Sequence, residues 1–97
     1  MATTIFKDIV STKGTTYNVM VSFNENRELV NFNCFCRFMS WEFWSKKFQS
    51  LGTICRHILK VTAEENITLP KRFQTERNLK LYNQYRKEAN LPTIQWQ

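Results

Sequence analysis

Hydrophobic and polar residues alternate along the first third of the chain. From 17 to 23 every second position is apolar, beginning with Tyr17 and Val19, and this period of two predicts a half-buried β-strand. The β-branched stretch 4–10 predicts a strand before it, and Thr12-Lys13-Gly14 supplies a turn between the two. Asn24-Glu25-Asn26-Arg27 predicts the connection to a third strand.

The third strand carries two cysteines within its hydrophobic pattern. Side chains two residues apart in a strand point to the same side. We therefore expect one face to carry Val30, Phe32, Cys34 and Cys36. The other face has a mixed composition that we expect to lie nearer solvent, namely Leu29, Asn31, Asn33 and Phe35.

Helical spacing follows in the rest of the chain. Residues 40–52 predict a helix that Ser40 caps and Gly52 ends, because its large apolar residues recur at helical intervals: Trp41, Trp44, Phe48 and Leu51. A second helix begins near Cys55. A third covers about 75–90.

The helix predicted at about 75–90 has two different sides. The apolar stripe consists of Leu81, Tyr82, Tyr85 and Ala89. The opposite side is polar and basic and consists of Arg77, Lys80, Gln84 and Lys87. Together these elements predict an α+β fold: a small, zinc-stapled antiparallel β-meander of about three strands, followed by two to three helices.

Every cysteine and the only histidine of the chain fall into two short pairs. Cys34 and Cys36 form a C-x-C pair, Cys55 and His57 form a C-x-H pair, and eighteen residues separate them. Together the pairs supply the four sulfur and nitrogen ligands of a tetrahedral Zn²⁺. Because four protein ligands leave no open coordination position, we expect one structural zinc ion.

Two other interpretations of these residues exist. Cysteines and a histidine can simply fill a core. Cys55 and His57 can also act as a nucleophile and its base, although a metal that holds both removes the thiolate that such catalysis needs. The sequence has no glutamate in a zinc-deaminase arrangement and no glycine-rich phosphate loop, so we expect no enzyme.

The two pairs resemble the SWIM zinc-finger pattern, in which C-x-C is followed by C-x-H. In particular, 48–61 resembles the motif F-x-x-x-G-x-x-C-R-H-x-L-K-V of plant far-red-impaired-response transcription factors and related Mutator-like transposases. The stretch 67–73 is similar to the continuation of that motif, and 38–46 is an insertion relative to it. The resemblance covers about 17–80 and implies a zinc finger that binds DNA or protein.

Length and cysteine content predict a single intracellular domain. We expect one domain over 1–97, with a finger core at about 17–65 and a basic helix at about 75–90. In so short a chain a metal contributes much of the stability. Three cysteines cannot all form disulfides, and no signal peptide or membrane span is visible, which favours an intracellular location, nuclear in a eukaryote.

The net charge of +6 lies entirely in the second half of the chain, because acidic and basic residues balance over 1–45. This asymmetry favours phosphate backbones or an acidic partner, although a solvated helix face gives the same pattern. The expected nucleic-acid contacts are Arg56, Lys60, Lys71, Arg72, Arg77, Lys80 and Lys87. Phe43 is a candidate aromatic contact, because it lies opposite the apolar side of the 40–52 helix.

These observations predict a structural zinc module that binds nucleic acid, above all DNA, and no membrane or small-molecule substrate. The alternative is a protein-interaction or dimerisation module of a transcription, transposition or recombination factor, with Phe35, Phe43 and Trp96 as anchors. Salt separates the two, because added salt weakens phosphate contacts far more than an aromatic protein interface.

Overall fold

The structure, a computed structural model, describes residues 2–10, 12–34 and 54–95. Within these ranges an antiparallel sheet of three strands is formed by β1 (Thr3–Val10), β2 (Thr16–Phe23) and β3 (Leu29–Cys34), which pair in sequence order. Two α-helices follow, α2 (Arg56–Glu64) and α3 (Glu76–Glu88), with the 3-10 helix η1 (Lys71–Phe73) between them. The predicted α+β fold, a β-meander followed by helices, is confirmed.

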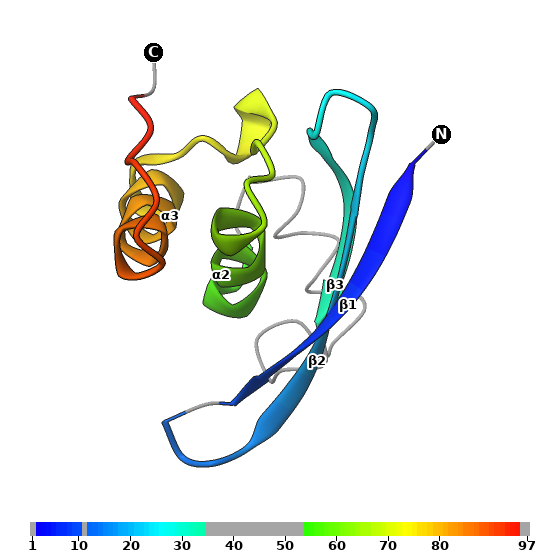
Figure 1. Cartoon of the computed structure of the whole chain (residues 1–97), viewed down its shortest axis with the longest axis vertical. Coiled ribbons are helices and arrows are strands. Elements are labelled where there is room, and N and C mark those ends of the chain that lie inside the picture. Colours follow the sequence, from blue (N-terminus) through cyan, green and yellow to red (C-terminus); the bar gives the residue numbers. More distant parts are fainter. Residues whose placement is uncertain (1, 11, 35–53, 96–97) are drawn as a thin grey trace.

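Helix α2 is the central layer of the fold. Figure 1 shows it between the sheet and α3, and it contacts β2 and β3 on one side and α3 on the other. A helix enclosed in this way needs apolar residues on most of its surface. Its buried apolar residues are Ile58, Leu59, Val61 and Ala63, and the buried hydroxyl of Thr62 donates to the backbone oxygen of Leu59 at 2.9 Å.

The predicted turns are confirmed, and each has a local cause. Gly14, in the β1–β2 turn, has a φ of 83°, which glycine adopts without steric cost. In the β2–β3 turn the side-chain oxygen of Asn24 accepts hydrogen bonds from the backbone N–H groups of Asn26 and Glu28, at 2.9 and 3.0 Å. An asparagine at this position therefore stabilises the turn through its own side chain.

The predicted division of β3 into two faces is wrong at its first residues. Leu29 is 2% exposed and Val30 is 46% exposed, the reverse of the expectation. The register shifts between Ser22 and Phe23, which pair with Asn31 and Leu29. This β-bulge adds one residue to β3 and exchanges the faces before it. Beyond the bulge, Phe32 and Cys34 are buried as expected.

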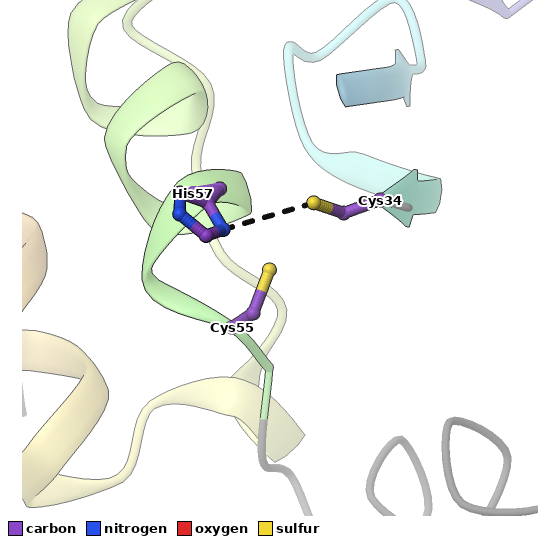
Figure 2. A group of neighbouring side chains, drawn as sticks. All are labelled: Cys34, Cys55 and His57. Carbon is purple, nitrogen blue, oxygen red and sulfur yellow. Dashed lines mark hydrogen bonds between the residues drawn. The ribbon is translucent and has the colours of Figure 1, made fainter. Parts of the chain in front are cut away.

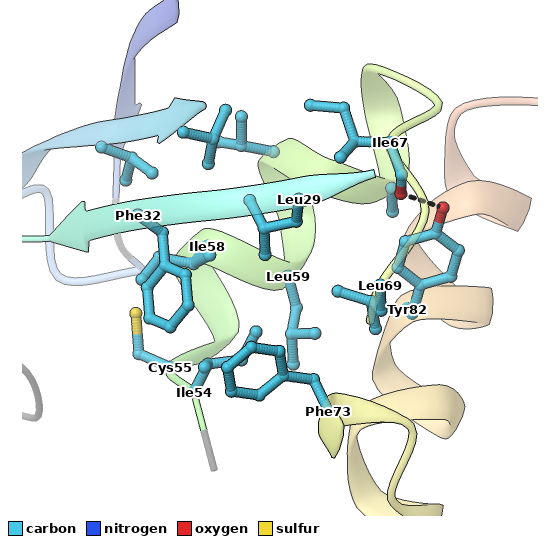
Figure 3. Packing of buried hydrophobic residues seen from close by; sticks show 14 of the residues in the cluster. Leu29, Phe32, Ile54, Cys55, Ile58, Leu59, Ile67, Leu69, Phe73 and Tyr82 are labelled. Carbon is cyan, nitrogen blue, oxygen red and sulfur yellow. Dashed lines mark hydrogen bonds between the residues drawn. The ribbon is translucent and has the colours of Figure 1, made fainter. Parts of the chain in front are cut away.

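The core lies between the sheet, α2 and α3 (Figure 3). Phe32 of β3 meets Phe73 of η1 edge to face, with ring centroids 5.4 Å apart. On α3, the hydroxyl of the buried Tyr82 donates to the backbone oxygen of Ile67 at 2.6 Å. These contacts connect the sheet and both helices through aromatic side chains.

The apolar stripe predicted for α3 is only partly correct. Tyr82 is buried and Leu81 and Tyr85 are half-buried, but Ala89 is exposed. Two polar residues, Asn78 and Arg86, are buried on the same stripe as Tyr82. They can occupy core positions because backbone oxygens accept their hydrogen bonds. Asn78 donates to the backbone oxygen of Phe73 at 2.8 Å, and Arg86 donates to the backbone oxygen of Pro92 at 2.7 Å.

The segment after α3 returns along that helix. The side-chain amide of Asn83 bonds to both the backbone N–H and the backbone oxygen of Ile94, at 2.8 and 2.9 Å. The helix predicted over 40–52, with Phe43, and the aromatic residues Phe35 and Trp96 lie outside the described residues.

Candidate metal centre

Two layers of the fold meet at three of the predicted ligands. Cys34 is the last residue of β3, Cys55 is the N-cap of α2, and His57 is the second residue of that helix. Because α2 packs on the inner face of the sheet, the end of β3 and the start of α2 lie side by side. Figure 2 shows the two sulfurs and the imidazole converging on a common space.

The separations within this group suit a metal ion. One ligand atom from each of Cys34, Cys55 and His57 lies within 4.8 Å of the other two. The Sγ of Cys34 is 3.8 Å from Nδ1 of His57. Tetrahedral zinc, with bonds of about 2.3 Å to sulfur and about 2.0 Å to nitrogen, holds its ligand atoms roughly 3.5–3.8 Å apart. Small side-chain rotations would therefore bring these three ligand atoms to the distances of a common metal ion.

The surroundings of the two cysteines favour a bound cation. Cys34 is fully buried and Cys55 is 2% exposed. A thiolate at such a depth needs a compensating charge, which a metal ion supplies. Cys55 also stands at the start of α2, where the partial positive charge of the helix end favours a thiolate.

Tyr17 of β2 orients the imidazole of His57. The two rings are tilted by 33°, with their centroids 4.7 Å apart. This contact holds Nδ1 on the side of Cys34, so Nδ1 is the nitrogen available to a metal. Nε2 lies on the opposite side of the ring. The alternation over 17–23 places Tyr17 on the inner face of β2, but no local pattern indicates its contact with His57.

The structure confirms that Cys34, Cys55 and His57 form a group that can hold a metal ion. The fourth predicted ligand, Cys36, lies outside the described residues. A tetrahedral site requires a fourth ligand, and Cys36 follows Cys34 by two residues. The identity of the ion as zinc and its number per chain remain predictions.

The predicted nucleic-acid contacts come from three elements. Arg56 and Lys60 lie one turn apart on α2, Lys71 and Arg72 belong to η1, and Arg77, Lys80 and Lys87 belong to α3. Six of the seven are exposed and Lys60 is half-buried; the exposed residues are Arg56, Lys71, Arg72, Arg77, Lys80 and Lys87. The structure therefore leaves these cations at the surface, and it brings those of α2 to the metal group.

Arg77 has a structural contact that the sequence does not indicate. Its Nη1 donates to the backbone oxygen of Ile54 at 2.8 Å and to the side-chain oxygen of Asn78 at 2.9 Å. Ile54 directly precedes Cys55, so this hydrogen bond fixes the backbone next to a predicted metal ligand. Arg72 also contacts the protein, with its guanidinium 4.7 Å from the centroid of the Phe73 ring.

Tyr85 of α3 lies where the two helices and the metal group meet. Burial raises the pKa of its phenol above the usual value, while the nearby guanidinium of Arg56 opposes the rise. Lys60 approaches its ring to 5.8 Å from the centroid. The sequence pattern predicts only a position on the apolar stripe for Tyr85.

Comparisons with protein-family models, with curated proteins and with solved structures give no match to this chain. Among the described residues, neither helix has the length and hydrophobicity needed to cross a bilayer. The geometry of the metal group and the distribution of charge are therefore the basis of any functional proposal.

Proposed function

We propose that this chain is a SWIM-like structural zinc module that binds nucleic acid, above all DNA, and has no catalytic activity. The observation that carries the proposal is the position of Arg56. It lies between Cys55 and His57 in sequence, its side chain is exposed, and Lys60 follows one turn later. A metal held by these neighbours would fix the start of α2 and hold its cations in place.

The zinc ion acts on structure in this proposal. Cys34, Cys36, Cys55 and His57 close its coordination sphere, so that no position remains for a substrate. Binding of one zinc ion contributes about 10–16 kcal/mol in small fingers, which exceeds or matches the usual stability of a small domain. Ligand thiolates must stay reduced, which fits an intracellular location.

The basic side chains would contact phosphates without reading bases. Lys71 of η1 and Lys87 of α3 are exposed lysines, and each can neutralise one phosphate. Contacts of this kind give affinity and orientation but carry no sequence information. We therefore expect unrelated duplexes to bind with similar affinity.

Titration of the zinc-loaded protein with unrelated duplexes at two salt concentrations tests the proposal. The proposal predicts binding at low salt that weakens steeply as salt increases. Absence of binding at roughly 50 mM salt would exclude nucleic acid as the main partner.

A second candidate function, protein interaction, is favoured by the outer face of β1. Phe6 and Val10 are 63% and 66% exposed, and they lie on the same face of the strand because their positions differ by an even number. Exposed apolar side chains of this size often mark interfaces. Binding of a partner that Phe6→Ser abolishes, and that added salt does not weaken, would support this function over the first.

A further inference from the structure

A cavity of about 180 Å³ opens beside the metal group. Its apolar wall is the end of β1, with Ile9 and Val10. Its polar lining consists of Thr12, Arg56, His57, Lys60 and Tyr85. We call it the β1–α2 cavity. It is smaller than the pockets of roughly 300–1,000 Å³ that hold drug-sized ligands, so it suits a single small group.

The charges lining the β1–α2 cavity are positive. Within the part of the chain that the structure describes, no carboxylate pairs with Arg56. Lys60 meets Glu64 only at 3.9 Å, and both side chains are more than a third exposed, so solvent screens this pair. Two cations with little internal compensation favour an anion at this position.

His57 connects the cavity with the metal group. Its Nδ1 faces Cys34, and the same imidazole lines the cavity. In a neutral imidazole whose Nδ1 binds a metal, Nε2 must carry the hydrogen. Nε2 is the ring nitrogen that does not face Cys34, so its N–H is the donor that His57 can offer to the cavity that it lines.

We propose that the β1–α2 cavity binds a phosphate group, and that bound metal strengthens this binding through the Nε2–H of His57. Arg56 and Lys60 supply charge-assisted hydrogen bonds, and the hydroxyls of Thr12 and Tyr85 supply two more donors. Donors from several elements match the oxygens of a phosphate better than the two oxygens of a carboxylate. The inference rests on the proposed function, in which the phosphate belongs to a nucleic-acid backbone.

The coupling does not come from the charge of the metal itself. Zn²⁺ with the thiolates of Cys34 and Cys55 is neutral, and a third thiolate from Cys36 makes the centre negative. Arg56 and Lys60 outweigh that charge, and the metal acts by fixing the tautomer and orientation of His57. By linkage, phosphate must raise the affinity for metal by the same factor by which metal raises the affinity for phosphate.

The single histidine of the chain makes a direct test possible. Long-range ¹⁵N–¹H correlation spectra of the protein loaded with one zinc contain the ring nitrogens of His57 alone. Inorganic phosphate, titrated against chloride at constant ionic strength, should shift the Nε2 signal saturably. Arg56→Gln and Lys60→Gln should each weaken this response about tenfold with zinc content unchanged. Lys7→Gln, the same charge change at an exposed lysine outside the cavity lining and outside the predicted nucleic-acid contacts, should leave it unaltered.

A short duplex distinguishes the sources of the phosphate. Displacement of inorganic phosphate by the duplex, read at the same Nε2 signal, supports the inference in full. A saturable phosphate response without duplex binding supports the cavity as a phosphate site but overturns its nucleic-acid source and the proposed function. Duplex binding with no response of Nε2 to phosphate or duplex overturns this inference and leaves the proposed function standing.

Discussion

Nδ1 of His57 lies 3.8 Å from the Sγ of Cys34, although one residue begins a helix and the other ends a strand of the opposing layer. This proximity depends on the packing of α2 against the sheet. A metal at this junction would therefore connect the two layers directly, and loss of a ligand would weaken the fold as a whole.

Removal of a ligand should accordingly loosen the domain. Cys34→Ala and Cys36→Ala should each lower zinc content from one ion per chain and reduce the melting temperature sharply, because metal binding contributes about 10–16 kcal/mol in small fingers. Elemental analysis and thermal unfolding measure both effects. Cobalt substitution provides a check, because its thiolate charge-transfer band should weaken in each variant. A Cys36→Ala protein that keeps full zinc content and stability would show that Cys36 is not a ligand.

Tyr17 should affect metal affinity without being a ligand. Its ring contacts the imidazole of His57 at a centroid distance of 4.7 Å. Tyr17→Leu should lower zinc affinity by roughly tenfold, as changes in the partners of metal-ligating histidines typically do. Competition with a chelator measures this effect. Tyr17→Phe keeps the ring and should bind zinc as the original chain does, so equal losses in both variants would contradict the stacking role.

Arg77 should contribute to stability more than a nearby surface lysine. Loss of its hydrogen bond to the backbone oxygen of Ile54 should make Arg77→Gln less stable by about 1–3 kcal/mol at saturating zinc. Lys87→Gln makes the same charge change at an exposed position of the same helix and should alter stability by no more than about 0.5 kcal/mol. Equal denaturant midpoints for the two variants would exclude this role.

Alkaline pH should destabilise the fold through Tyr82. Burial raises the pKa of its phenol above the usual 10.0, with Arg86 opposing the rise. The contribution of the neutral phenol is therefore fully present below pH 10 and is lost as pH rises through the higher folded-state pKa. Tyr82→Phe should cost about 1–3 kcal/mol at neutral pH, because the carbonyl of Ile67 loses its donor, and should flatten the alkaline loss.

Tyr85→Phe is the matched control for that substitution. Tyr85 is half-buried, and its hydroxyl has no hydrogen bond within the described residues, so the change should cost no more than about 0.5 kcal/mol at neutral pH. Unfolding curves recorded at neutral pH and saturating zinc separate the two tyrosines, whereas burial raises the pKa of both phenols, so both contribute to the alkaline loss. Similar curves for both variants would contradict the special position of Tyr82.

Much of the fold follows from local patterns in the sequence. The alternation over 17–23 and the turn residues at Gly14 and Asn24 predict β2 and its connections, because strand faces and turns depend on near neighbours. The spacing of Cys34, Cys55 and His57 predicts the metal group, since few other roles require those residue types in pairs.

The remaining features depend on partners distant in sequence. The burial of Leu29 in place of Val30 follows from the register with β2, which no pattern within β3 reveals. Arg86 is buried because the backbone oxygen of Ala63 and the side chain of Asn66, both more than one element away, accept its hydrogen bonds. The contact of Tyr17 with His57 likewise appears only once the layers are assembled.

The dependence of duplex affinity on salt, measured for the zinc-loaded protein and for a variant with five cations replaced by Gln, tests the central claim most directly. The replaced residues are Arg56, Lys71, Arg72, Lys80 and Lys87, which belong to α2, η1 and α3. The account predicts similar zinc content and melting, lower affinity, and a slope of log K against log salt that is shallower by about 0.9 for each phosphate that the variant no longer neutralises. Equal affinities and slopes for the two proteins, or no duplex binding by the original chain at low salt, would contradict it.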